Sequence, residues 1–293
     1  MLTAGFFQIV NRSPKGRRLV FRALFEFLAR RHRHLTNWTQ MNFGYADGSG
    51  PGHMIELQTQ DENERYCRQL YLRTVNGCDL AGKDVVEVSC GRGGGAEFLH
   101  RHLGSNTMTG VDIASSAIDF CRRVHRAPGL RFVQGDAENL PLFDQSADAV
   151  VNVEASFCYA DLDRFFAEVQ RVLRPGGYFL YADLQTPGSI DGLKARLRRG
   201  GFDVLTLDDI TRNVLAALEL DAERRANLIR KNASWYLRHA MAAFAGTPGS
   251  RIPTLLAQGR EGYFVFTLRK PAKPGSSSPS RCNASVMVSL ALQ

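Results

Sequence analysis

A short apolar run followed by a glycine-rich turn, in residues 84–96, constrains the fold of this chain more than any other stretch. Its letters are DVVEVSCGRGGGA. The β-branched residues Val85, Val86 and Val88 are typical of a buried parallel strand, and the glycines that follow predict a tight turn. Residues 96–103 then have a helical pattern, so that a helix N-terminus faces the turn. Strand, turn and helix together predict a pocket for a nucleotide-type ligand.

The rest of the chain repeats this alternation of strands and helices. Six further strands are predicted at residues 106–112, 130–134, 147–153, 177–183, 204–207 and 263–268. Further helices are predicted at residues 58–74, 115–125, 165–173 and 190–199, with Ser115 as the N-cap of the second. Repeated βαβ units predict an α/β fold, a Rossmann-like, doubly wound and mostly parallel seven-stranded sheet. In such sheets ligands bind at the carboxyl ends of the strands.

The glycine turn alone leaves two ligand classes open. Gly91, Gly93 and Ala96 satisfy the G-x-G-x-x-A pattern of dinucleotide sites, with Asp112 about 20 residues downstream. That pattern keeps a nicotinamide-dependent oxidoreductase, or a binding protein without activity, as remote alternatives. Glu87 argues against them, because an acid before the glycines would face a positive charge rather than a pyrophosphate.

Further landmarks resolve the choice of ligand. TGVD at residues 109–112, GDAENLP at 135–141 and VLRPGGY at 172–178 follow the glycine turn in order. Over roughly residues 55–270, this set resembles the class I S-adenosylmethionine-dependent methyltransferases. The runs EVSCG (87–91), NVEAS (152–156) and YADL (181–184) are similar to those of the mycobacterial phthiotriol/phenolphthiotriol dimycocerosate methyltransferases and of relatives that O-methylate polyketides and fatty acids. The resemblance implies S-adenosylmethionine as cofactor and a lipid or polyketide hydroxyl as methyl acceptor.

The cofactor has three parts that need complementary groups: a ribose diol, an adenine and a sulfonium cation. Asp112, at the tip of the second strand, is expected to accept hydrogen bonds from both ribose hydroxyls. Asp136 is expected to accept one from the adenine amino group. Gly91 and Gly93 admit the methionine portion, and Glu87 acts electrostatically or orders the turn. The full expected set of cofactor-binding residues is Glu87, Ser89, Gly91, Gly93, Asp112, Ile113, Asp136, Ala137 and Asn152.

The catalytic base is less clear from the sequence. The resembled enzymes carry a histidine just after the Glu-Ala-Ser run, where this chain has Phe157 and Cys158. Methylation of an alcohol requires removal of its proton. Asp183 is therefore the leading candidate for the base and Glu154 the second, although helix capping or an ion pair would also explain either acid. A carboxylate acceptor, which needs no base, and a carbon acceptor remain alternatives.

The domain organisation follows from these assignments. Residues 1–54 are expected to hold an amphipathic helix and an aromatic, glycine-rich loop. Residues 55–270 form the methyltransferase domain, with a helical cap at 208–251, and the Pro/Ser-rich residues 271–293 form a disordered tail. The helix at residues 15–34 carries seven Lys/Arg and one acid. It is predicted either to pack on the domain or over its pocket, or to contact a membrane surface or a lipid substrate.

Composition excludes other partners. The net charge is +8, but no helix-turn-helix, zinc finger or single-strand-binding pattern accompanies it, so that no nucleic-acid partner is expected. The six cysteines form no CxxC pair, and no metal site is predicted. No apolar run approaches the ~20 residues that span a bilayer, and no signal peptide is recognisable. These features predict a cytoplasmic protein, with peripheral membrane contact through residues 15–34 as the alternative. They carry no signal for an oligomeric state.

Overall fold

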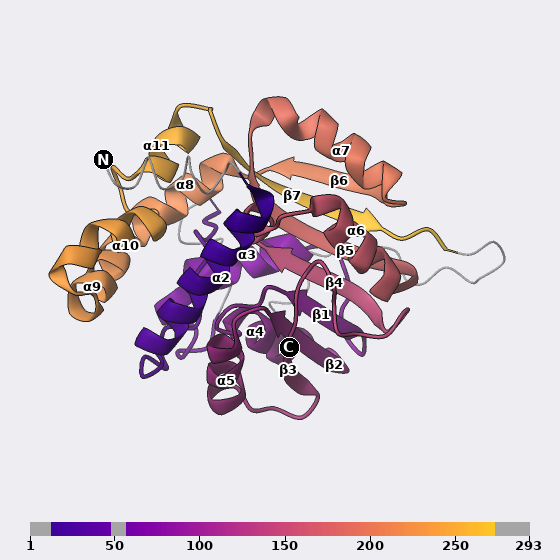
Figure 1. Cartoon of the computed structure of the whole chain (residues 1–293), viewed down its shortest axis with the longest axis horizontal. Coiled ribbons are helices and arrows are strands. Elements are labelled where there is room, and N and C mark those ends of the chain that lie inside the picture. The colour runs from indigo at the N-terminus through magenta and orange to yellow at the C-terminus, as the bar shows by residue number, and fades with distance from the viewer. Residues whose placement is uncertain (1–12, 48–56, 273–293) are drawn as a thin grey trace.

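The computed structural model describes residues 13–47 and 57–272 (Figure 1). Seven strands form one sheet in the order β3-β2-β1-β4-β5-β7-β6. All neighbours are parallel except β7, which runs antiparallel to both β5 and β6. The strands are β1 (Asp84–Val88), β2 (Thr107–Asp112), β3 (Leu130–Gln134), β4 (Ala147–Val153), β5 (Leu173–Gln185), β6 (Asp203–Asp209) and β7 (Gly262–Arg269). The predicted doubly wound sheet is confirmed.

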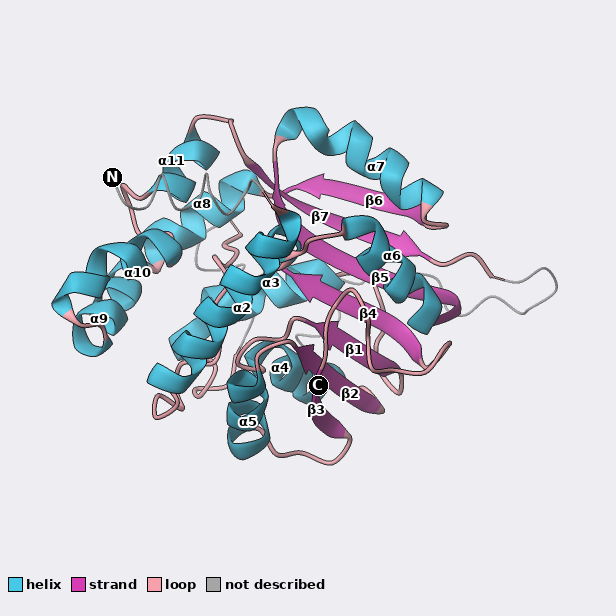
Figure 2. Cartoon of the chain, viewed as in Figure 1, coloured by secondary structure: helices cyan, strands magenta, loops and turns pink. Residues whose placement is uncertain are grey.

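Helices cover both faces of the sheet (Figure 2). The helices of the domain are α3 (Arg65–Val75), α4 (Gly94–Leu103), α5 (Ser115–Val124), α6 (Leu162–Val172), α7 (Ile190–Arg199), α8 (Thr211–Leu220), α9 (Ala222–Asn232), α10 (Arg238–Phe244) and α11 (Arg251–Ala257). Strand side chains alternate between two cores, as the pleat requires. Val85 packs with Leu70 of α3 and Phe98 of α4. Val86 packs with Phe165 of α6 on the opposite face.

Several predicted helix starts and one predicted cap are wrong. The helix predicted from residue 58 begins at Arg65, after a single 3-10 turn at Glu62–Glu64, and the helix predicted from residue 165 begins at Leu162. The helix after the glycine turn begins at Gly94 rather than at residue 96, because Gly93 is its left-handed N-cap with φ 77°. Ser115 is not an N-cap, because Ala114 holds that position and has no side chain to donate or accept. Glu26, from the helix near the N-terminus, supplies the missing acceptor: its Oε2 accepts a hydrogen bond of 3.3 Å from the amide of Ser116 in the first turn. Asp112 accepts from the amide of Ala114, which precedes the helix.

Element bounds also differ around the cap. The strand predicted at 204–207 extends to Asp209, because its residues stay in antiparallel register with β7 as far as the pair of Asp209 with Phe264. The helices that follow run from Thr211 to Ala257, past the predicted end of the cap at residue 251. The division into domains itself stays a prediction. The predicted tail lies outside the described residues beyond position 272.

Helix α2 (Pro14–Arg31) lies along the carboxyl edge of the parallel strands, where Figure 1 shows it in indigo. Ser13 caps it, and its inner residues Phe21, Leu28 and Ala29 are buried. The ring of Phe21 meets Phe157, after β4, edge-on with centroids 5.6 Å apart, and Phe25 meets Phe244 of α10 at 6.0 Å. The helix therefore packs across the edge where ligands of such sheets bind. No helix in the described ranges is both long and apolar enough to cross a membrane.

Candidate active site

The glycine turn after β1 has a backbone that only glycine adopts easily. Gly91 and Gly93 have φ of 53° and 77°. A Cβ at Gly91 would lie 2.6 Å from Cε of Met41, and one at Gly93 would lie 2.8 Å from Sγ of Cys121. The turn is tied to β2, because the Gly91 amide donates a 2.9 Å hydrogen bond to Oδ2 of Asp112. Neighbouring side chains thus pack directly against the backbone of the turn, which leaves no room for a side chain at either glycine.

Asp112 is buried at the end of β2, with 8% of its surface exposed. Its two carboxylate oxygens accept from the amides of Gly91 and Ala114, and burial raises the pKa of the carboxyl in spite of these bonds. Each carboxylate oxygen has a second lone pair. The next residue, Ile113, is half-buried, and its carbonyl accepts from the side chain of Gln134. Asp112 can therefore still accept from two hydroxyl groups.

Asp136 follows β3 and is engaged by α2. Nη1 of Arg18 lies 2.8 Å from Oδ2 of Asp136 and 3.5 Å from a carboxylate oxygen of Glu138. The other oxygen of Asp136 accepts from the Glu138 amide at 3.0 Å, and Ala137 between them is buried. Asp136, which is expected to accept from the adenine amino group, is thus ion-paired with Arg18, 118 residues away in the sequence.

Glu87 is 1% exposed, at the end of β1. Its Oε1 accepts a 2.5 Å hydrogen bond from the hydroxyl of Tyr71 in α3, while its Oε2 has no partner among the described residues. Removal from water raises the pKa of this carboxyl to about 8. A buried carboxylate oxygen without a partner is costly unless a ligand faces it.

Asn152, at the end of β4, is fully buried and only partly satisfied. Its Nδ2 donates to the carbonyl of Val88 and to the hydroxyl of Tyr159, at 2.9 and 2.8 Å. Its Oδ1 has no partner within the described ranges. The same Tyr159 hydroxyl lies 2.7 Å from Oγ of Ser89, which has a positive φ of 60°. The structure therefore brings Ser89 and Asn152 together through Tyr159, a residue that the sequence analysis missed because no motif includes it.

Asp183 lies inside the protein, with no exposed surface. Its Oδ2 accepts from the amide and the hydroxyl of Ser156, at 2.7 and 2.5 Å, and its Oδ1 accepts from the amide of Leu184 at 2.8 Å. Burial raises its pKa to about 6. These three bonds fix the turn after β4 to the end of β5.

Glu154 is the first residue of that turn and is half-buried, with a left-handed φ of 53°. Its Oε2 accepts from the amide of Phe43 at 2.9 Å and from the hydroxyl of Tyr263 at 3.1 Å. Loss of solvent around the carboxyl, with the negative charge of Asp183 nearby, raises its pKa to about 8. An acid with such a pKa is a stronger base than an ordinary glutamate once it is ionised.

Phe157 and Cys158 offer no base in place of the histidine of the resembled enzymes. Phe157 is 39% exposed and packs edge-on against Phe21 of α2. Cys158 is a half-buried free thiol whose pKa is raised well above its usual value by burial. Neither side chain can therefore act as a base near neutral pH.

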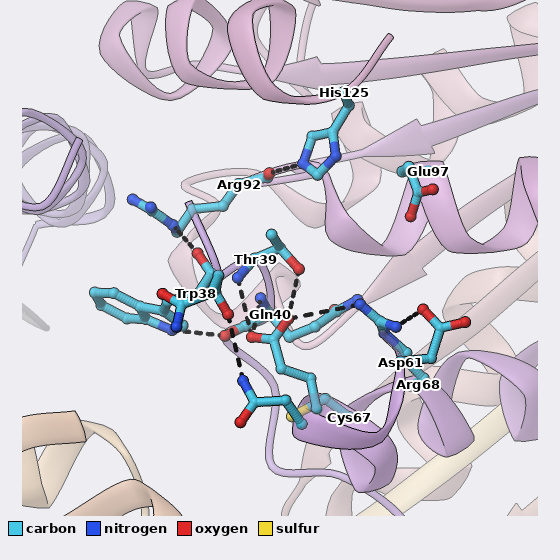
Figure 3. A network of polar contacts seen from close by, with 12 residues as sticks. Trp38, Thr39, Gln40, Asp61, Cys67, Arg68, Arg92, Glu97 and His125 are labelled. Carbon is cyan, nitrogen blue, oxygen red and sulfur yellow. Dashed lines mark hydrogen bonds and ion pairs between the residues drawn. The ribbon is translucent and has the colours of Figure 1, made fainter. Parts of the chain in front are cut away.

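A further residue missed from the sequence is Arg92, in the glycine turn itself (Figure 3). It is 3% exposed and lies over the rings of Phe120 and Trp38, 3.8 and 5.0 Å from their centroids. Its guanidinium donates to the carbonyls of Trp38 and Leu35, at 2.5 and 2.7 Å. Its own carbonyl accepts from the ring of His125. Arg92 thus connects the segment after α2 to the glycine turn.

Comparison with known proteins agrees with this geometry. Residues 86–181 match the family described as a methyltransferase domain. The phthiotriol/phenolphthiotriol dimycocerosates methyltransferase of Mycobacterium tuberculosis is 41% identical over 230 residues, which are 78% of this chain and 84% of that relative. The chain is a class I S-adenosylmethionine-dependent methyltransferase of this family. S-adenosylmethionine is its cofactor.

Two other proteins are also similar to this methyltransferase. The fatty-acid O-methyltransferase of Mycolicibacterium smegmatis is 39% identical over 233 residues, covering 80% of this chain and 84% of that protein. The structure of geranyl diphosphate C-methyltransferase from Streptomyces coelicolor A3(2), in complex with Mg²⁺, geranyl diphosphate and S-adenosyl-L-homocysteine, has a TM-score of 0.57 at 17% identity. The match covers 80% of this chain and 92% of that one. The structural likeness shows the fold alone.

Proposed function

We propose that this methyltransferase transfers a methyl group to a hydroxyl of a lipid or polyketide-type molecule. The observation that carries the proposal is Glu154, an acid with a pKa of about 8 at the carboxyl end of β4, which has one carboxylate oxygen outside its bonds to the Phe43 amide and the Tyr263 hydroxyl. Both curated relatives have names that describe lipid methylation, which supports an acceptor of this class. A base of raised pKa suits an alcohol, whose proton leaves as the oxygen is methylated.

The residues at the carboxyl edge of the sheet fit the cofactor. Asp112 would accept from the ribose hydroxyls, and the unpartnered oxygens of Glu87 and Asn152 are acceptors that would face its cationic, polar portion. The glycine turn, whose backbone needs a positive φ at Gly91 and Gly93, lies between these acceptors and would contact the same portion. Bound S-adenosylmethionine supplies an electrophilic methyl group on a sulfonium. Asp136 can accept a hydrogen bond from the adenine only if the adenine binds beside Arg18 on this carboxylate or displaces Arg18 from it.

Glu154 is proposed as the base, ahead of Asp183. A base must reach the proton that it removes. Asp183 has no exposed surface, and its oxygens are occupied by Ser156 and Leu184. Glu154 keeps an oxygen, Oε1, outside the bonds to Phe43 and Tyr263. Glu154 would take the hydroxyl proton, while Asp183 positions the turn on which Glu154 lies.

The second candidate function is methyl-ester formation on a fatty acid. It is favoured by the 39% identity to a fatty-acid O-methyltransferase, and an ionised carboxylate would need no base. The two functions give different products. We expect incubation with labelled S-adenosylmethionine and matched twelve-carbon acceptors to label the alcohol at least tenfold faster than the carboxylate, giving an ether that resists alkali. An alkali-labile product from the carboxylate alone would establish the ester reaction instead.

The outer face of α2 is proposed to contact the membrane surface that holds such an acceptor. Leu19 and Phe27 on this face are 66% and 51% exposed, and Arg22 and Arg31 beside them are exposed as well. Apolar side chains flanked by arginines suit an anionic lipid surface. We expect Leu19→Glu with Phe27→Glu to lower binding to phosphatidylglycerol vesicles at least tenfold in a sedimentation assay, since each apolar side chain contributes about 2 kcal/mol when buried.

A matched control for that experiment is Phe143→Glu. Phe143 is 87% exposed, but it precedes β4 and so lies at the opposite edge of the sheet. This substitution should leave vesicle binding unchanged. Equal binding by all three proteins would contradict a membrane-facing role for α2.

A further inference from the structure

A small cavity lies beside the cofactor edge, between the end of α2, the segment 38–42 and the cap helices α9 and α10. Its volume is about 50 Å³. Much of its wall is apolar, and the side chains that make it so are Met41, Leu228, Ile229, Met241 and Phe244. A cavity of this volume admits one oxygen function with a few carbons rather than a whole acyl chain. It is therefore a place for one defined part of a ligand.

Two polar side chains in this wall have unsatisfied atoms. His32 and Gln40 both line the cavity and are 4% and 5% exposed. Nδ1 of His32 and Nε2 of Gln40 have no hydrogen-bond partner among the described residues. Each buried polar atom left unpaired costs about 1–3 kcal/mol. Two such atoms in one cavity wall indicate a ligand that supplies the missing partners.

The charges around the cavity indicate that this ligand group is neutral. Arg225 donates to Asp221 and to the carbonyls of Asn42 and Phe43, at 2.8, 3.0 and 3.0 Å. Arg224 pairs with the same Asp221 at 2.5 Å. Burial, with the charges of Arg31 and Arg92, lowers the pKa of His32, which favours an uncharged imidazole. The two cations that line the cavity are thus already paired, and an amide and a neutral imidazole recognise an uncharged oxygen.

The segment from Gln40 to Phe43 connects the cavity with the proposed reaction centre. Met41 of this segment reaches the glycine turn, and the Phe43 amide bonds Glu154. Three residues span at most about 11 Å. We propose that the cavity binds a second, uncharged oxygen of the methyl acceptor, a hydroxyl or carbonyl a few carbons from the one that is methylated, through Gln40 and His32. This inference rests on the proposed lipid O-methyltransferase function.

The test uses two probes that differ by one oxygen, dodecane-1,3-diol and dodecan-1-ol. Each is titrated by calorimetry into the full chain saturated with S-adenosylhomocysteine. We expect the diol to bind about tenfold more tightly than the alcohol, since 1.4 kcal/mol, the net contribution of one or two hydrogen bonds, is a factor of ten. Gln40→Met, which keeps the side-chain length but removes the amide, should bring this ratio close to one.

Two further variants separate recognition from folding. Gln258→Met makes the same change at an exposed site after α11 and should keep the tenfold ratio. Ala245→Leu fills the cavity from the α10 side without removing a polar group, and should also abolish the preference for the diol. If Gln40→Met fails to bind S-adenosylhomocysteine, the test uses Ala245→Leu alone, and the ratio of diol to alcohol affinity in that variant shows whether the cavity recognises the second oxygen.

The outcomes distinguish this inference from the function on which it rests. Equal affinities for the two probes in the wild-type protein loaded with S-adenosylhomocysteine would overturn the second-oxygen site alone. Binding of neither probe to this loaded protein would contradict the proposed hydroxyl acceptor and the second-oxygen site with it. A tenfold preference that survives both Gln40→Met and Ala245→Leu would overturn it as well. A wild-type protein that does not bind S-adenosylhomocysteine would instead contradict the cofactor on which the proposed function depends.

Discussion

Replacing Asp112 with alanine is expected to weaken the binding of S-adenosylhomocysteine at least 100-fold. In the proposed site the variant would lose two hydrogen bonds from the ribose to a charged acceptor, each contributing about 1.5–3 kcal/mol. The variant also loses the bonds that hold the amides of Gly91 and Ala114, so that the glycine turn is less ordered. Calorimetric titration of the two proteins measures the difference directly.

The control for Asp112→Ala is Asp191→Ala, which removes a carboxylate that is 92% exposed on α7. Its affinity for S-adenosylhomocysteine should stay within twofold of the wild type. A thermal melt of each variant identifies any loss of folded protein. Folded Asp112→Ala with wild-type affinity would show that the cofactor does not use the end of β2.

Replacing Glu154 with glutamine should lower kcat by about 10²–10⁴, the range contributed by a positioned general base. Cofactor affinity should not change, because Glu154 is assigned to the acceptor rather than to the cofactor. The pH profile provides a second measurement. The pKa of Glu154 is raised to about 8, so that the carboxyl is mostly protonated at pH 7 and becomes a base as the pH increases. The wild-type kcat should therefore rise with pH and level off above about 8.

The Glu154→Gln variant should lose that rise of kcat with pH. If the rise came from another titrating group, the variant would keep it. Asp183→Asn is the informative comparison. It weakens the acceptor for Ser156 and should lower stability and kcat. It also removes the negative charge that helps raise the pKa of Glu154, so that kcat should still rise with pH but level off at a lower pH than in the wild type. A Glu154→Gln enzyme with the wild-type pH profile would contradict the assignment of the base.

Local pattern was sufficient to predict most of the sheet. The β-branched run of β1 and the glycine turn after it specify a buried strand and a left-handed backbone without reference to the rest of the chain. The order of the later motifs placed Asp112, Asp136 and Asn152 at the carboxyl edge. Helix starts were less reliable, because the first-turn amide of Ser116 in α5 is bonded by Glu26 of α2, from another element, rather than by Ser115.

The roles of individual side chains depend on contacts between distant segments. One carboxylate oxygen of Glu154 accepts hydrogen bonds from Phe43 and Tyr263, both more than 100 residues away. Asp183 is buried because the turn after β4 packs over it. The pairing of Arg18 with Asp136 spans 118 residues. No spacing rule predicts such pairs. The sequence could therefore name Glu154 and Asp183 as candidates but could not rank them by access to a proton.

The central claim is that the carboxyl edge of β1, β2 and β4 binds S-adenosylmethionine. The most direct test is a side-by-side calorimetric titration of the wild-type chain with S-adenosylhomocysteine and with NAD. The account predicts saturable binding of one S-adenosylhomocysteine per chain and no heat of binding from NAD. Saturable binding of NAD, with none of S-adenosylhomocysteine, would contradict it.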